Sequence, residues 1–228
     1  MTTISEVMEM LNTQADPAQL DGMSRYGITT TKRLGVNVPQ MRKIAKECGK
    51  DHGLALALWD TGIAEAMMIA SMIDVPEQVT DQQMEDWVKD FNSWDVCDQV
   101  CMNLFEKTAL AWQKVRDWSE RDEEYVKRAA YALIACLAWH DQDASDENFI
   151  RLIPLIQAGS NDGRNYVKKA VSWALRNIGK RNSTLNVVAL QTAQDLKEME
   201  SKPARWIGSD AVRDLTSDAT KRRLERTG

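Results

Sequence analysis

One short segment places an indole ring and a carboxylate one helical turn apart. It reads Asp90-Phe91-Asn92-Ser93-Trp94-Asp95-Val96-Cys97-Asp98. Ser93 is a suitable N-cap for a helix that begins at Trp94. Trp94 and Asp98 then stand at i and i+4 and share one face. A carboxylate beside an aromatic ring can hold a cation, and it can also orient or deprotonate a water molecule. The alternative is that Trp94 belongs to the core and Asp98 caps or pairs with a neighbouring helix.

The stretch at residues 24–39 has the least regular pattern in the chain. It is expected to form a loop that enters a helix starting at Pro39, a favourable first-turn residue. Lys32 and Arg33 in this loop either contact phosphates or lie on an ordinary surface. Asp95, near the start of the helix expected at Trp94, is expected to interact with the helix dipole.

A five-residue segment occurs twice. Tyr125-Val126-Lys127-Arg128-Ala129 returns 41 residues later as Tyr166-Val167-Lys168-Lys169-Ala170. A period of roughly 40–47 residues is typical of HEAT or armadillo units, which must stack to bury their apolar faces. Cations at one phase of such a stack fall along one surface, which suits a polyanion such as DNA.

The second copy carries an aromatic residue that the first copy lacks. Trp173 stands where the first copy has Ala132. Lys169, Trp173 and Arg176 are spaced by four and three residues, so they share a helix face. They form an aromatic flanked by cations, although a tryptophan that packs between repeats has the same spacing. Lys180 and Arg181 follow at the expected helix exit, where they suit the dipole or a phosphate.

The whole chain is expected to be helical, because glycine and proline are few and alternating strand patterns are absent. With no linker, its 228 residues form a single HEAT-like repeat domain, residues 1–228, of the all-α, armadillo-type solenoid class. Helices are expected at residues 3–13, 17–24, 39–49, 51–59, 63–74, 80–89, 94–105, 110–119, 121–139, 145–157, 163–179, 183–199, 203–213 and 217–226.

Several classes of function are excluded by what the sequence lacks. It has no Walker loop, no GxGxxG and no GxSxG elbow. Four cysteines without a CxxC pair and only two histidines argue against a zinc site. The thiols are expected to be reduced and mostly buried. With no signal pattern and no spanning apolar run, the expected compartment is cytoplasmic and no membrane contact is expected.

The charge distribution is uneven. The net charge is −5, yet residues 160–228 hold 14 Lys and Arg against 8 Asp and Glu. Because salt confines each field to about 8–10 Å, an acidic protein can still present a basic face. The alternative is that these charges form a solvated surface.

The ordered set of motifs resembles the DNA alkylation repair family of AlkD-like glycosylases. The stretches that match cover most of residues 20–182: Tyr26, Leu34-Gly35-Val36, Pro39-Gln40-Met41-Arg42, Ser93-Trp94-Asp95-Val96-Cys97-Asp98, Val126-Lys127-Arg128-Ala129, and Val167-Lys168-Lys169-Ala170-Val171-Ser172-Trp173-Ala174-Leu175-Arg176. The resemblance implies a HEAT-like solenoid whose basic surface holds duplex DNA with alkylated bases. It implies a monofunctional glycosylase for cationic purines such as N3-methyladenine and N7-methylguanine, without a deep base-flipping pocket, a metal or another cofactor.

The family's functional residues fall on defined positions of this chain. The resemblance implies that the catalytic set is Trp94, Asp98, Arg128 and Trp173, with Arg128 holding a phosphate near the lesion. The residues expected to contact DNA are Tyr26, Lys127, Lys168, Lys169, Arg176, Lys180 and Arg181. A monomer is expected. Two alternatives stay open: a non-catalytic binder of branched or distorted DNA, and a HEAT-type protein-interaction scaffold, which the net acidity favours.

Overall fold

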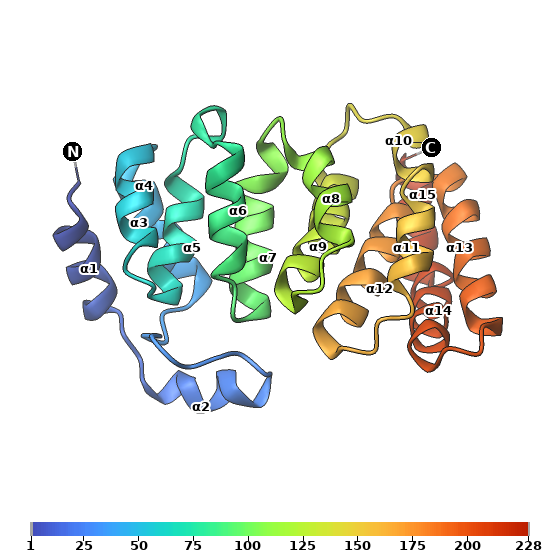
Figure 1. Ribbon diagram of the computed structural model, residues 1–228, viewed down its shortest axis with the longest axis horizontal. Helices are drawn as coiled ribbons and strands as arrows, with labels where there is room; N and C mark the ends of the chain where they lie inside the picture. Colours follow the sequence, from blue (N-terminus) through green and yellow to red (C-terminus); the bar gives the residue numbers. More distant parts are fainter. Residues whose placement is uncertain (1, 228) are drawn as a thin grey trace. The chain divides into compact units, whose positions relative to one another are not determined.

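A computed structural model describes residues 2–227 of the chain. The described residues are helical and turn-like, with no strand among them, so the all-α prediction is confirmed. The chain divides into two compact units, residues 1–110 and 111–228. Each unit is a stack of packed helices (Figure 1). The single domain expected from the sequence stays a prediction.

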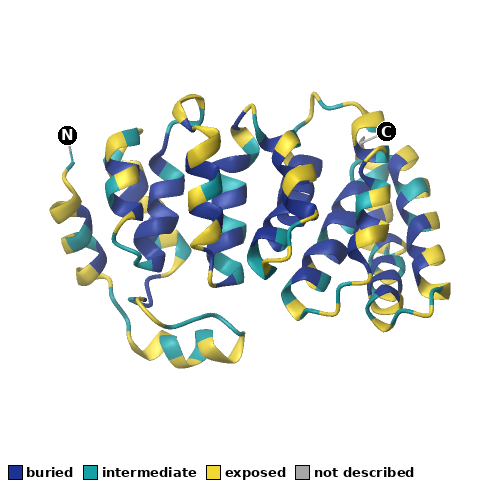
Figure 2. Ribbon diagram, viewed as in Figure 1, coloured by how far each residue is buried: buried dark blue, intermediate teal, exposed yellow. Residues whose placement is uncertain are grey.

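The first unit is built around one apolar helix. Nine of the ten residues of α5 (Ala64–Ile73) are buried, and α3, α4 and α7 pack against it (Figure 2). The helices of this unit are α1 (Ile4–Thr13), α2 (Ala18–Arg25), α3 (Val38–Cys48), α4 (His52–Trp59), α5, α6 (Asp81–Lys89) and α7 (Trp94–Asn103), with 3₁₀ turns η1 (Pro76–Gln78) and η2 (Phe105–Lys107). Trp59 of α4 stacks on Trp87 of α6 with ring centroids 3.8 Å apart.

The second unit is built around α9 (Glu124–His140), which packs between α8 (Ala111–Ser119) and α12 (Asn165–Gly179). The remaining helices are α10 (Asp146–Ile150), α11 (Ile153–Gly159), α13 (Ser183–Glu198), α14 (Lys202–Leu215) and α15 (Asp218–Thr227). α12 also packs against α13 and α14, so the last part of the chain covers the second copy of the repeat.

The sequence repeat reappears as a repeat of interactions. The rings of Tyr125 and Tyr166, which open the two copies, stack with centroids 5.7 Å apart. Asn177 Nδ2 donates to the carbonyl of Ala135, 42 residues earlier. Arg164 Nη1 donates to the carbonyl of Asp122, also 42 residues earlier. Neighbouring copies are therefore joined in register.

One expected helix is wrong. Residues 145–157 form two helices, α10 and α11, rather than one. Pro154 lies in the first turn of α11. It has no backbone N–H and its ring would clash with the carbonyl of Ile150, so a continuous helix cannot pass through it. The other expected helices are present, with ends shifted by up to three residues.

Candidate nucleic-acid interface

The indole of Trp94 is held by the loop that precedes α3. Trp94 is the first residue of α7 and is half-buried. Its Nε1 donates to the backbone carbonyl of Tyr26, 3.1 Å away. The ring of Tyr26 is 77% exposed. Two of the aromatic residues expected to contact DNA are thus joined through one hydrogen bond, although 68 residues separate them.

An ion pair fixes this loop to the start of α7. Arg33 Nη1 and Nη2 donate to the two carboxylate oxygens of Asp95, at 2.7 and 3.0 Å. Arg33 Nε donates to the carbonyl of Thr29. The Arg33 side chain is 2% exposed, so the expectation that it contacts a phosphate or lies on the surface is wrong. Asp95 lies in the first turn of α7, where a carboxylate favours the helix dipole as expected, and it also binds Arg33.

Ser93 stands at the N-cap position of α7 without making the expected cap. Its hydroxyl donates to Asp95 Oδ1 at 2.5 Å instead of accepting a backbone N–H of the helix. The hydroxyl also accepts the N–H of Thr29 at 3.4 Å. A side chain that the sequence marked as a helix cap therefore links the loop to the ion pair.

The far end of the loop rests on a buried carboxylate. Glu65 of α5 is fully buried and accepts the backbone N–H groups of Leu34 and Gly35. Gly35 has φ +82°, and a Cβ there would lie 2.1 Å from the carbonyl of Asp16. Only glycine fits this position, so the loop has one defined path between α2 and α3.

Asp98 lies one turn after Trp94 on the same helix. Val96, Cys97, Val100 and Cys101 are buried, whereas Trp94, Asp98 and Gln99 are half-buried. The apolar side of α7 thus faces the core, and the indole and the carboxylate share the side that solvent reaches. Trp94 is thus not enclosed in the core, and the catalytic roles of Trp94 and Asp98 stay a prediction.

Arg128 is deeply placed in the second unit. It is 5% exposed, and its Nη1 donates to the carbonyl of Tyr166 at 2.6 Å. Its neighbour Lys127 is half-exposed. Arg128 therefore joins the two copies of the repeat, and its expected contact with a phosphate stays a prediction.

The candidate DNA-contacting residues of α12 lie on different sides of the helix. Lys169 is exposed and Trp173 is half-buried. Lys168 lies on another side of the helix, where its Nζ is 4.5 Å from the ring centroid of Trp206 on α14. This cation–π contact holds Lys168 to α14.

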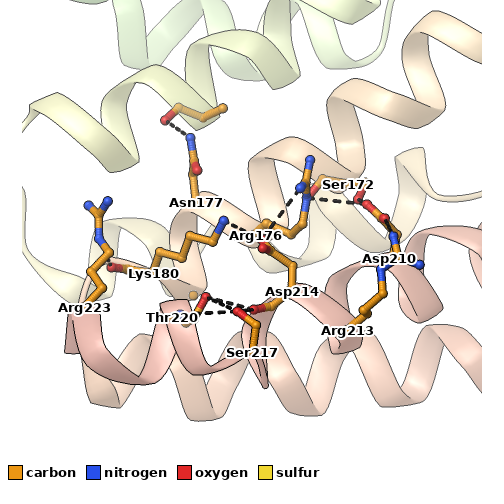
Figure 3. Close-up of polar contacts among 12 residues, drawn as sticks. Ser172, Arg176, Asn177, Lys180, Asp210, Arg213, Asp214, Ser217, Thr220 and Arg223 are labelled. Carbon is orange, nitrogen blue, oxygen red and sulfur yellow. Dashed lines mark hydrogen bonds and ion pairs between the residues drawn. The ribbon is translucent and has the colours of Figure 1, made fainter. Parts of the chain in front are cut away.

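Arg176 and Lys180 meet two carboxylates of α14 (Figure 3). Arg176 Nε lies 3.5 Å from Asp210 Oδ2, and its Nη1 lies 3.6 Å from Asp214 Oδ2. Lys180 Nζ forms an ion pair with the same Asp214 oxygen. Ser172 donates to Asp210 at 2.7 Å. Two cations expected to contact DNA are thus balanced by two carboxylates inside the unit.

The side chain of Arg181 binds backbone carbonyls at and just after the end of α9. Its Nη1 and Nη2 donate to the carbonyls of Ala138 and Ala144, at 3.4 and 2.7 Å. Its guanidinium carbon lies 4.7 Å from the ring centroid of Phe149. A cation near the last carbonyls of a helix is favourable for the dipole, so a structural role accounts for this residue.

The carboxylates that these cations meet were not among the residues predicted from the sequence. Asp210 and Asp214 are four residues apart on α14, and Arg176 of α12 is four residues from Lys180, the C-cap of that helix. Spacing within one helix does not tell which residues of another helix it will meet, so the sequence held no signal for this pairing. Tyr26, Trp94 and Asp98 belong to the first unit, and the remaining candidate residues belong to the second.

In residues 2–227 all four cysteines are free, and three of them are buried. Cys97, Cys101 and Cys136 are buried thiols, and Cys48 is partly exposed. Burial, followed by the nearby Glu47 charge, raises the pKa of Cys48. Within that range, no group of three or more His, Cys, Asp or Glu side chains is placed to hold a metal ion. The same residues include no helix long and apolar enough to cross a membrane.

Comparison with known proteins gives both a family and a fold. The sequence profile of a family described as DNA alkylation repair enzyme matches residues 7–215. No curated protein matches the chain. One similar solved structure belongs to "a new family of proteins related to the HEAT-like repeat DNA glycosylases with affinity for branched DNA structures". Its identity is 17% and its TM-score 0.83, over 98% of this chain and 96% of that one.

A second similar structure is a designed armadillo repeat protein in complex with a peptide, at 16% identity and TM-score 0.38, over 98% of this chain and 88% of that one. The HEAT-like solenoid expected from the repeat is confirmed by the first of these structures.

Proposed function

Because the chain belongs to the DNA alkylation repair enzyme family, we propose that it is a glycosylase that releases cationic alkylated purines from duplex DNA. The observation that carries the proposal is the pair formed by Trp94 and Asp98. Both are half-buried on the outer side of α7, one turn apart, and the loop held by Arg33 and Asp95 supports the indole.

The chemistry needs little more than a placed carboxylate. A purine alkylated at N3 or N7 is already a cationic leaving group, so protonation by a general acid adds little. As the glycosidic bond breaks, its electron pair leaves with the base and positive charge develops on the sugar. We assign to Asp98 the stabilisation of that charge and the positioning of the water that attacks the sugar.

The aromatic residues recognise the charge of the substrate. The ring faces of Trp94 and Trp173 are proposed to contact the cationic nucleotide, because an aromatic quadrupole attracts a cation. Arg128 is proposed to hold a backbone phosphate through a charge-assisted hydrogen bond. Tyr26, Lys127 and Lys169 are exposed or half-exposed and are the candidates for further DNA contacts.

A second function has one observation in its favour. The similar solved structure is described as having affinity for branched DNA structures. The alternative proposal is a non-catalytic binder of branched or distorted DNA that uses the same residues. It differs from the first in a single measurable property, the release of a free base.

The test uses duplex DNA containing N7-methylguanine and measures free base, with DNA affinity measured in parallel. We expect release by the wild type, loss of at least a hundredfold in Asp98→Asn, and nearly unchanged affinity, because one removed electrostatic contact in a transition state costs about 10²–10³ in rate. Asp86→Asn is the matched control, since Asp86 is exposed on α6 of the same unit.

Equal rates in Asp98→Asn and the wild type would remove Asp98 from the chemistry. Absence of released base from the wild type, together with tight binding of branched DNA, would establish the alternative.

A further inference from the structure

Four cations gather where three helices of the first unit end. Arg42 and Lys46 lie on the last two turns of α3, Lys50 follows α3, and Lys107 follows α7. Arg42, Lys46 and Lys50 line a hollow of about 330 Å³, together with Ala45, Gly49 and Met72. No carboxylate is among the described residues that line it.

Two of these cations have a structural reason to stand there. Lys50 Nζ donates to the carbonyls of Met72 and Asp74, at 3.1 and 2.6 Å, at the end of α5. Lys107 Nζ donates to the carbonyl of Asn103, the last residue of α7, at 2.8 Å. The last carbonyls of a helix lack partners within it and carry partial negative charge, so lysines stabilise these ends.

Helix capping does not account for the other two. The side chains of Arg42 and Lys46 are exposed, and neither makes a hydrogen bond or ion pair with another of the described residues. Lys50 and Lys107 are also close enough to repel each other. Burial, and after it the charge of Lys107, lowers the pKa of Lys50, while Asp74 and Glu77 oppose the change. An anion bound here would relieve that repulsion.

The cluster contrasts with its surroundings. Residues 1–110 hold 9 Lys and Arg against 17 Asp and Glu, a net charge of −8, yet four of those nine cations are at this one place. Lys43, one residue from Arg42, faces a different groove that is lined by Glu6, Glu9 and Glu47. On one face of α3, therefore, Arg42 and Lys46 line a hollow without a carboxylate, whereas on another face Lys43 lies in a groove with carboxylates.

We infer that Arg42, Lys46, Lys50 and Lys107 form a phosphate-binding patch for the backbone of duplex DNA, an inference that rests on the proposed function. Asp98 and Asn103, the last residue of α7, are five residues apart, about 7.5 Å at 1.5 Å per residue, and Lys107 lies beyond Asn103. One strand of a duplex advances about 3.4 Å per nucleotide. The patch therefore contacts phosphates at least about two nucleotides away from the damaged one.

The test compares Arg42→Gln/Lys46→Gln with Lys43→Gln/Lys89→Gln, which removes the same charge from other exposed positions of the unit. Binding of an undamaged 24-base-pair duplex is measured between about 50 and 200 mM salt. The first variant should reduce the slope of log K against log salt by about 1.8, because each lost phosphate contact removes about 0.9. The control should keep the wild-type slope. Thermal unfolding checks that both variants fold.

Duplex length provides a second readout. When fewer than about two nucleotides flank the central lesion on either side, the wild type and the patch variant should bind equally. Equal slopes for patch and control variants on the long duplex would overturn the inference, and so would absence of DNA binding by the wild type. Failure of base release, in contrast, bears on Asp98 and leaves these slopes unchanged.

Discussion

The guanidinium of Arg33 binds the carboxylate of Asp95 through two hydrogen bonds, of 2.7 and 3.0 Å. Asp95 adjoins Trp94, whose indole is bonded to the backbone of Tyr26 in the loop that carries Arg33. The ion pair and the indole bond thus join the same two segments. Removal of Arg33 should affect both the stability of the first unit and the position of Trp94.

Arg33→Met should lower the free energy of unfolding by about 3 kcal/mol, because it leaves a mostly buried carboxylate without its partner. Urea unfolding measures this change. The double variant Arg33→Met/Asp95→Asn no longer buries a lone charge and should recover part of the loss. If the two single substitutions are additive in the double variant, the pair contributes no coupling energy.

If Arg176 and Lys180 contact DNA as proposed, the carboxylates of α14 should compete with it for these two cations. In Asp210→Asn/Asp214→Asn, Arg176 and Lys180 lose the carboxylates that balance their charge. DNA affinity should rise, and the salt dependence should steepen by up to about 1.8 in slope if both cations reach phosphates. Salt titrations of duplex binding measure both quantities.

The control is Asp195→Asn/Asp218→Asn, which removes two exposed carboxylates of the same unit. This variant changes the net charge equally but releases neither Arg176 nor Lys180. Equal slopes for the two double variants would contradict direct competition and leave only a general effect of charge.

Gly208 lies where α14 packs closely against α13. A Cβ at this position would lie 2.4 Å from the carbonyl oxygen of Ala193 and 2.7 Å from the backbone nitrogen of Lys197. Backbone atoms cannot move aside as a flexible side chain does, so Gly208→Ala should destabilise the fold by about 1–3 kcal/mol.

Gly22→Ala is the matched comparison, because a Cβ at Gly22 of α2 meets nothing within 4 Å. It should stabilise by about 0.5–1 kcal/mol through helix propensity. Urea unfolding of both variants gives the two signs. A Gly208→Ala protein as stable as the wild type would show that α13 and α14 can separate at no cost.

Tyr131 should make stability fall at alkaline pH. Its hydroxyl donates to the carbonyl of Leu155, and burial, followed by the Asp162 charge, raises its pKa from 10.0 to about 12. The folded state therefore keeps the proton more tightly than the unfolded state. This stabilisation is complete below pH 10 and is lost as pH rises from about 10 to 12, by roughly 2–3 kcal/mol.

Unfolding free energies measured at about pH 9 and pH 11.5 should differ less in Tyr131→Phe than in the wild type. Tyr26→Phe, which changes an exposed ring, should follow the wild type. An equal alkaline loss in Tyr131→Phe would assign the effect to other groups.

Interactions within one helix were the ones that the sequence could predict. Trp94 and Asp98 share the outer side of α7 because the spacing of four residues fixes their relation in any α-helix. Interactions between helices were missed. Arg33 finds Asp95 across 62 residues, and Arg176 finds Asp210 on a different helix. Which side chains meet there depends on the packing register, and local spacing carries no information about it.

The break between α10 and α11 could have been predicted, since Pro154 is visible in the sequence. The apolar periodicity of residues 145–157 continues across Pro154 and favoured one helix, although proline has no backbone N–H. The chemistry of the site stays a prediction. Burial and hydrogen bonds describe where Asp98 and Arg128 lie, whereas their roles depend on a bound substrate.

The register between the two repeat copies also bears on how the chain finds its fold. The bonds from Asn177 to Ala135 and from Arg164 to Asp122 each span 42 residues, about one repeat. The entropy lost in closing a loop grows only with the logarithm of its length, yet it must be lost before any contact forms. Neighbouring copies can therefore associate early, by closing a loop of one repeat at a time, and folding can start at any such pair and spread along the stack.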